Sequence, residues 1–223
     1  MKNKLLFFIL SFYLITPTKG QEILQIPLYS SLDPVAEALN YQGFQLLEDG
    51  RYPLAKAYFW EAIQIDSTNI DYFYNLGMAC LQDKDYAFAL KAYRIAKNSF
   101  PDFPDLYFYS GDLLQKMERY EEAILEYNKA IALAADEPNP QLHYLFFFNR
   151  GNAYFKSKNF KAAIQDYNQT ISISPEYYGA YANRGYANYH IKNYKSACND
   201  WEIAASLGYP KAIYYLQKYC NKQ

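Results

Sequence analysis

The sequence is short of the residues from which most catalytic and metal sites are built. It contains 2 histidines and 3 cysteines in 223 residues. The histidines, His143 and His190, lie far apart and outside any metal-binding spacing such as HExxH. A GxSxG elbow, a GxxxxGK[ST] phosphate loop and a CxxC pair are also absent from the sequence. We therefore predict that the protein is not an enzyme and has no catalytic residues, no cofactor and no metal site.

An excess of charge of either sign is also missing. The chain has 22 basic and 23 acidic residues, for a formal net charge of −1. Proteins that bind nucleic acid carry a basic patch or stripe, and no run of lysine and arginine appears in this sequence. We predict that nucleic acid is not a partner.

The chain has no apolar run that reaches the length of a membrane span, which is about 20 residues. The apolar run from Leu5 to Ile15 follows two lysines and precedes small residues that end at Gly20. This order is typical of a cleaved export signal, and an uncleaved N-terminal anchor is the alternative. We predict a signal peptide over residues 1–20 and no membrane span after its cleavage. The mature chain would then have 19 basic and 23 acidic residues, a net charge of −4.

Aromatic residues are abundant instead, at 19% of the chain with 26 tyrosines, and they recur in a fixed register. Five glycines repeat with a period of 34, lengthened to 40 before Gly151, and each has an alanine at +12 and a large aromatic at +16. Such self-similarity predicts stacked helical repeats. The register consists of Gly43, Gly77, Gly111, Gly151 and Gly185, of Ala55, Ala89, Ala123, Ala163 and Ala197, and of Phe59, Tyr93, Tyr127, Tyr167 and Trp201.

The small residues of this register need a common physical reason. A glycine inside a helix costs about 1 kcal/mol relative to alanine. We expect the glycines to lie where two helices approach closely, with the alanines of the second helix at the same contact and the aromatics filling the space that remains. A helical hairpin of this kind cannot bury its apolar face alone, so neighbouring hairpins must stack.

This register resembles the tetratricopeptide repeat (TPR) family, whose pattern combines Leu-Gly, Tyr, Ala, an aromatic, Ala and Pro at the same spacing. The resemblance implies an all-α fold, an α-solenoid of five helical hairpins with a C-terminal capping helix, and a role in binding other proteins. The terminal proline of the pattern is present as Pro101 and Pro175, and it is replaced by Ser67 and Ala135 in two other repeats. The five copies cover residues 36–69, 70–103, 104–137, 144–177 and 178–211.

The segment before the first repeat, residues 21–35, is apolar but has no helical period. We leave two interpretations open: it lies on the first repeat or along the groove, or it is a disordered leader. Its end is clearer, because Asp33 followed by Pro34 is typical of an N-cap and a first helical residue.

The other end of the stack requires a cap with a polar outer side. Residues 210–221 are predicted to form this capping helix, with Ala212, Ile213 and Leu216 on its buried face. Gly208 precedes the helix at a position that tolerates the left-handed conformation.

The cysteines predict one disulfide and one buried thiol. Cys80 replaces a leucine of other repeats, so we expect it to fill the core. Cys198 precedes Gly208 and Cys220 follows it at nearly equal distances along the chain. These offsets can place the two side by side in an antiparallel hairpin, and an oxidising compartment would join them. The C-terminal pattern around Trp201 is similar to the ends of other exported bacterial TPR proteins, which implies a periplasmic or secreted location.

In the TPR family, the fifth, ninth and twelfth positions of the first helices line a concave groove. The same positions in this sequence, together with one neighbouring asparagine, imply an aromatic-rich groove that binds peptides. Gln115 also occupies a twelfth position. The implied groove residues are Asn40, Phe44, Leu47, Tyr74, Met78, Phe108, Asp112, Phe148, Asn152, Phe155, Asn183, Tyr186 and Tyr189.

The groove predicts the kind of partner. TPR domains that grip a terminal carboxylate place a lysine where this chain has Phe148, so we expect no carboxylate capture here. We predict a scaffold that binds a protein or peptide segment through apolar side chains. Two alternatives stay open: a carbohydrate-binding module, against which Trp201 counts because it occupies the buried aromatic position, and a structural subunit of a cell-envelope assembly.

Overall fold

The computed structural model describes residues 33–135 and 143–220, which form helices and turns and no β-strand. The signal peptide predicted over residues 1–20, most of the segment 21–35 and the last residue of the capping segment lie outside the described residues. The helices are α1 (Pro34–Glu48), α2 (Tyr52–Ile65), α3 (Ile70–Gln82), α4 (Tyr86–Ser99), α5 (Pro104–Lys116), α6 (Tyr120–Ala134), α7 (Tyr144–Lys156), α8 (Phe160–Ile173), α9 (Tyr178–His190), α10 (Tyr194–Ser206) and α11 (Lys211–Tyr219).

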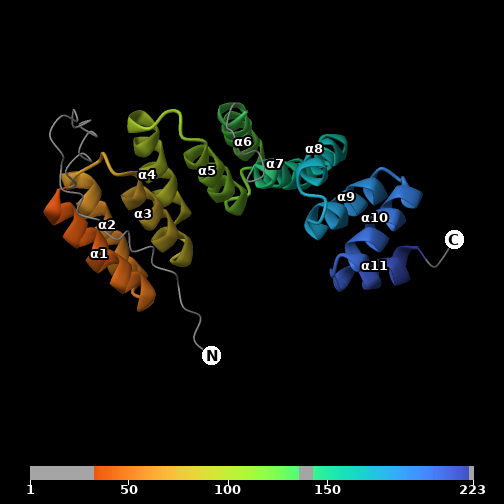
Figure 1. Ribbon diagram of the computed structural model, residues 1–223, viewed down its shortest axis with the longest axis horizontal. Helices are drawn as coiled ribbons and strands as arrows, with labels where there is room; N and C mark the ends of the chain where they lie inside the picture. Colours follow the sequence, from red (N-terminus) through yellow and green to blue (C-terminus); the bar gives the residue numbers. More distant parts are fainter. Residues whose placement is uncertain (1–32, 136–142, 221–223) are drawn as a thin grey trace, which may run out of the picture. The chain divides into compact units, whose positions relative to one another are not determined.

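Consecutive helices pack against one another in antiparallel hairpins, and each hairpin packs against the next (Figure 1). The first helices of neighbouring hairpins also touch, with contacts between α1 and α3, between α5 and α7, and between α7 and α9. The predicted all-α fold of five hairpins and a C-terminal helix is therefore confirmed. Among the helices of the described ranges, none is long and apolar enough to cross a membrane.

The glycine register positions the second helix of each hairpin. A Cβ atom added to Gly111 would lie 2.6 Å from a ring carbon of Tyr127, and one added to Gly185 would lie 2.5 Å from Nε1 of Trp201. In the other three repeats, the aromatic at +16 meets its register glycine in the same way. The tight contact expected at these glycines is present, and the group that would clash with a side chain there is the aromatic ring of the second helix.

Each hairpin turn uses one residue in the left-handed conformation, at +7 from the register glycine. That residue is a glycine only in the first repeat, where Gly50 has φ 73°. The turns of the other hairpins place Lys84, Glu118, Lys158 and Lys192 at φ 58–65°. Because the backbone makes the same turn in all five, the first and second helices keep the same alignment throughout.

The start of the stack follows the sequence prediction. The side chain of Asp33 accepts hydrogen bonds from the backbone N–H groups of Val35 and Ala36, with Pro34 as the first helical residue. This satisfies two of the donors that a helix N-terminus leaves without partners.

The end of the stack differs from the prediction at one residue. Gly208 has the expected positive φ, 91°, and α11 buries Ala212 completely. However, Ile213 is 54% exposed, and Tyr215 takes its place on the buried face at 9% exposure. The predicted pattern of Ala212, Ile213 and Leu216 is therefore wrong at Ile213, because Tyr215 packs against Trp201 and Tyr186 instead.

The cysteines divide as the sequence suggests. A disulfide joins Cys198 of α10 to Cys220 directly after α11. Cys80 is a free cysteine that is fully buried in the core of the first repeats. Burial raises the pKa of its thiol to about 12, so the group stays protonated and packs as an apolar side chain.

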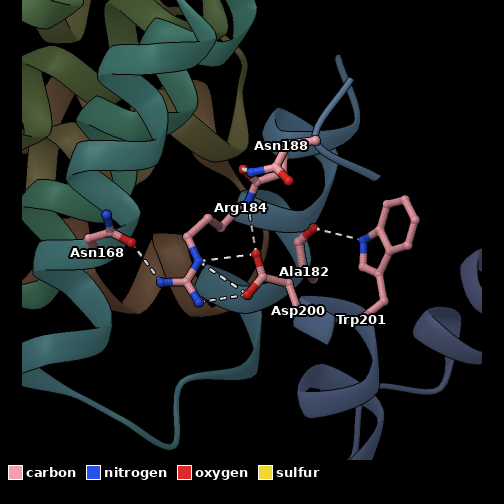
Figure 2. Close-up of polar contacts among 7 residues, drawn as sticks. Asn168, Ala182, Arg184, Asn188, Asp200 and Trp201 are labelled. Carbon is pink, nitrogen blue, oxygen red and sulfur yellow. Dashed lines mark hydrogen bonds and ion pairs between the residues drawn. The ribbon is translucent and has the colours of Figure 1, made fainter. Parts of the chain in front are cut away.

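A buried ion pair joins the two helices in each of the last two hairpins. The guanidinium of Arg150 donates to both carboxylate oxygens of Asp166 at 2.8 and 2.6 Å. In the fifth repeat, Arg184 binds Asp200 in the same way, with a shortest distance of 2.6 Å (Figure 2). Asp166 and Asp200 are only 4% and 2% exposed, so each depends on its arginine for compensation of its charge.

Candidate functional site

Two adjoining hollows lie along the first helices of the third, fourth and fifth repeats. The smaller, between α5 and α7, has a volume of about 290 Å³, and the larger, between α7 and α9, has about 360 Å³. Both are lined by Gln115 and Asn152, so they adjoin each other along the helices. The other lining residues are Asp112, Lys116 and Asn149 in the smaller hollow, and Phe155, Lys156, Tyr167, Asn183 and Tyr186 in the larger.

The floor of each hollow is built from the same hydrogen-bonded triplet. Oδ1 of Asp112 accepts from the hydroxyl of Tyr127 at 2.6 Å and from Nδ2 of Asn149 at 2.9 Å. One repeat further on, Oδ1 of Asn152 accepts from the hydroxyl of Tyr167 at 2.9 Å and from Nδ2 of Asn183 at 2.8 Å. The aromatic that fills the glycine site within one hairpin thus also positions the groups that face the groove.

These triplets leave some amide groups open to a ligand. The triplets use Nδ2 of Asn149 and Asn183 and Oδ1 of Asn152. The other amide atom of each side chain takes no part in the triplets of the described residues. An amide side chain that offers both a donor and an acceptor matches a peptide group, which carries one of each. The floor of the hollows is therefore suited to the backbone of an extended segment.

The charges of the site combine one half-buried acid, Asp112, with two basic side chains at the rim. Burial raises the pKa of Asp112, and its hydrogen bonds with Tyr127 and Asn149 oppose this effect. Lys116 and Lys156 are exposed and line the two hollows. Carboxylate capture was not expected from the sequence, because Phe148 stands where related domains have a lysine. The two rim lysines supply positive charge from a different position, so that argument no longer excludes an acidic group.

The structure brings together five of the predicted groove residues and disposes the rest differently. Around the two hollows it gathers Asp112, Asn152, Phe155, Asn183 and Tyr186. In the first two repeats, Phe44 and Met78 are 41% and 43% exposed, Asn40 accepts a 2.9 Å hydrogen bond from Asn75, and Leu47 and Tyr74 are half-buried. This portion of the predicted groove is mostly apolar.

The prediction that Phe108 is accessible to a partner is wrong. Phe108 is only 8% exposed and stacks on Phe146 with ring centroids 4.7 Å apart. Phe148 is half-buried and contacts Tyr167 and Tyr177. Tyr189 packs against Tyr219 at the end of the capping helix, with ring centroids 4.7 Å apart. These three rings therefore pack against neighbouring helices, in their own hairpin or in the next element of the stack.

Several residues that line the two hollows were not predicted from the sequence. Asn149, Lys116 and Lys156 lie outside the fifth, ninth and twelfth positions, and Tyr167 was assigned to the core alone. The sequence could have indicated the two lysines, because both occupy the same position of the repeat, five residues after a register glycine. Residues 33–135 and 143–220 contain no group of three His, Cys, Asp or Glu side chains arranged to hold a metal ion.

Two segments of the chain match a family model described as tetratricopeptide repeat, over residues 104–137 and 144–177. A curated protein, the UDP-N-acetylglucosamine–peptide N-acetylglucosaminyltransferase of Giardia intestinalis, is 30% identical over 108 residues. That match covers 48% of this chain and only 7% of the transferase.

Solved structures share the fold at low sequence identity. MamA from Desulfovibrio magneticus RS-1 superposes with a TM-score of 0.70 at 18% identity, over 79% of this chain and 97% of that one. YrrB, described as a TPR protein with an unusual peptide-binding site, gives 0.66 at 17% identity, over 82% and 92% of the two chains. PilF of Pseudomonas aeruginosa gives 0.66 at 17% identity, over 84% and 87%.

Proposed function

We propose that this chain, a tetratricopeptide repeat protein, is a non-enzymatic scaffold that binds an extended segment of a partner protein along α5, α7 and α9. The observation that carries the proposal is the repeated triplet of Asp112 with Asn149 and of Asn152 with Asn183. It holds amide groups in two adjoining hollows, where they can pair with successive peptide groups. The peptide-binding site named for the similar fold of YrrB is consistent with this use of the scaffold.

The side chains of the segment would be selected by the walls of the larger hollow. Phe155 and Tyr186 offer apolar ring surface there, and Lys156 offers a positive charge at the rim. An aliphatic or aromatic side chain would bury apolar area against the two rings, which stabilises binding by about 25 cal/mol per Å². The exposed Phe44 and Met78 would extend the apolar contact toward the first repeats.

A peptide array probed with the purified protein tests this proposal. Sequences retained by the wild type are measured again with Asn152→Ala, for which we expect about a tenfold weaker affinity from the lost backbone hydrogen bonds. Asn128→Ala is the matched control, because Asn128 is an exposed amide that accepts a hydrogen bond from Arg150 away from the hollows. Equal peptide binding by the wild type and Asn152→Ala would reject the groove as the site. If the substitution instead abolished retention of the protein on glycans, a carbohydrate-binding module would be favoured.

We also propose that the protein is exported from a bacterial cell. The disulfide between Cys198 and Cys220 supports this location, because disulfides persist in oxidising compartments such as the periplasm. Mass spectrometry of the protein isolated from its native cells tests it. A mature N-terminus at Gln21 with both cysteines protected from alkylation is the expected result, and an intact Met1 with free thiols would contradict export.

A further inference from the structure

A basic hollow of about 350 Å³ lies between α4, α5 and α6 and shares no residue with the groove. Four of its lining side chains are cationic and only two are acidic, whereas the whole chain has a net charge of −1. The charge of this site is therefore opposite to that of the protein. The hollow is lined by Leu90, Arg94, Lys97, Tyr107, Leu114, Arg119, Glu122, Leu125, Glu126 and Lys129.

The two acids of the basic hollow are already paired within it. Lys97 donates to Glu126 at 2.6 Å, and Arg119 donates to Glu122 at 2.7 Å through two hydrogen bonds. Among the ion pairs of the described residues, none involves Arg94 or Lys129, the other two cations of the lining. Within that part of the chain, two positive charges around the same hollow are thus left without a carboxylate partner.

The environment of Lys97 also favours additional negative charge. Its side chain is only 15% exposed, and burial lowers the pKa of Lys97 despite the hydrogen bond with Glu126. The ammonium lies 4.5 Å from the centre of the Tyr107 ring, and that of Lys129 lies 5.9 Å from the same ring. Two cations around one ring repel each other, and an anion bound between them would relieve this repulsion.

Apolar surface adjoins these charges. Leu125 is 67% exposed, the highest exposure among the large apolar side chains of the described ranges, and Leu90 is half-buried beside it in the lining. A small inorganic anion would leave this surface in water. A ligand that covers it needs an apolar group next to its negative charge.

The fifth repeat contains the equivalent hollow, and there the arginine is paired, although the exposed Lys195 makes no ion pair among the described residues. Its lining carries Asn168, Asn188 and Asn199 at the register positions of Arg94, Leu114 and Leu125. Arg184 is held by Asp200 and by Oδ1 of Asn168 at 2.6 Å (Figure 2). Two unpaired cations beside an exposed leucine are therefore a feature of the basic hollow that the equivalent hollow of the fifth repeat does not share.

We propose that the basic hollow of α4, α5 and α6 binds an acidic segment of a partner protein, in which a carboxylate side chain stands beside an apolar one. The carboxylate pairs with Arg94 and Lys129, and the apolar side chain covers Leu125. Glu122 and Glu126 sit at the same lining and would repel a multiply charged anion, which favours the single charges of aspartate and glutamate. The site is separate from the groove and does not depend on the function proposed for it.

Titration of the ¹⁵N-labelled full chain with the peptide GSELESG, followed by NMR, tests the proposal. We expect amide shifts in α4, α5 and α6, and a dissociation constant raised about fivefold by Arg94→Gln and by Lys129→Gln. The matched control is Lys195→Gln, which removes an exposed cation from the equivalent hollow of the fifth repeat and should leave binding unchanged. Higher salt should weaken the wild-type interaction, because the paired charges are solvent-accessible.

The opposing outcomes are distinct. Equal binding of GSQLQSG would show that the carboxylates are not recognised, and an equal response to inorganic phosphate would show that the apolar contact contributes nothing. Shifts confined to Asn152 and its neighbours in the groove would move the peptide to the other site. Each of these results overturns the assignment to the basic hollow, and only the shifts in the groove would also bear on peptide binding there.

Discussion

The second and fifth repeats hold their paired helices together with different chemistry at the same two positions. In the second repeat, the residue before the register glycine is Leu76 and the residue at +15 from that glycine is Ala92, both fully buried. In the fifth repeat, these positions are Arg184 and Asp200, joined by hydrogen bonds as short as 2.6 Å. The neighbouring glycine–aromatic contact is retained in both repeats.

The difference shows which part of the hairpin is required and which is free to vary. The glycine must stay small because an aromatic ring occupies the adjoining space. The site next to it accepts either apolar side chains or a paired charge, since both satisfy the condition that nothing buried is left uncompensated. The charged version adds a link between repeats, because Arg184 also donates to Asn168 of the preceding hairpin and Arg150 to Asn128.

The largest expected effect comes from breaking the charged version on one side. Asp200→Ala would leave Arg184 without its carboxylate, and we expect the free energy of unfolding to fall by about 3 kcal/mol, at the low end for a buried pair because the arginine side chain retains 20% exposure. Urea denaturation followed by circular dichroism measures this change.

The matched variant converts the fifth repeat to the chemistry of the second. Arg184→Leu combined with Asp200→Ala reproduces the pair of Leu76 and Ala92, and we expect it to recover most of the lost stability. A double variant as unstable as Asp200→Ala alone would show that the two repeats are not interchangeable at this site.

The capping disulfide is a second feature that the first repeats do not share. Cys198→Ser with Cys220→Ser opens a loop of 22 residues, and we expect a loss of about 3 kcal/mol in the chain-entropy model. Hydrogen exchange should show lower protection for α11 and unchanged protection for α3 and α4. A reductant should destabilise the wild type and leave the variant unaffected, and an equal response of the two would argue against the bond.

The smallest expected effect concerns the protonation of two carboxyl groups, Asp85 in the second repeat and Asp166 in the fourth. Burial raises the pKa of Asp166 above its ordinary value although Arg150 opposes this, whereas the hydrogen bond from Lys56 lowers the pKa of Asp85. Acidification should therefore protonate Asp166 at a higher pH than Asp85. A ¹³C NMR titration of the carboxyl carbons measures both, and the reverse order would contradict these environments.

The signs for stability follow from the same shifts. Asp85 contributes stability above its unfolded pKa, which is lost as the pH falls through its lower folded value. Asp166 acts in the opposite direction: because its folded pKa is raised, its own contribution to stability becomes more favourable as the pH falls through that folded pKa toward the unfolded pKa. Asp85→Asn should thus flatten the acid limb of the stability curve, and Asp166→Asn should not.

Features carried by short spacing within one repeat were predictable. The five hairpins, the N-cap at Asp33, the left-handed Gly208 and the buried Cys80 depend on residues in the same or the next helix. The burial of Phe108 and the exposure of Ile213 were not predictable, because Phe146 of the next repeat covers Phe108 and Tyr215 takes the buried place expected for Ile213. A repeat pattern states which positions face inward on average, and it does not state which of two inward side chains reaches the core.

The candidate site divides in the same way. Asn152 and Asn183 were identified by their positions in the repeat, but their hydrogen bond, and the one from Tyr167, depend on the distance between α7, α8 and α9. Arg184 and Asp200 illustrate the same limit, since they belong to different helices and only the packed hairpin brings their charges together.

The sequence alone determined that this protein is a row of helical hairpins, because small and aromatic residues at one period allow only one way to close each pair of helices. The tertiary structure decided which polar groups are satisfied and which remain open, on the groove and at the basic hollow. Hydrogen bonds and ion pairs depend on positions accurate to a few tenths of an ångström, and only packing between neighbouring repeats sets them.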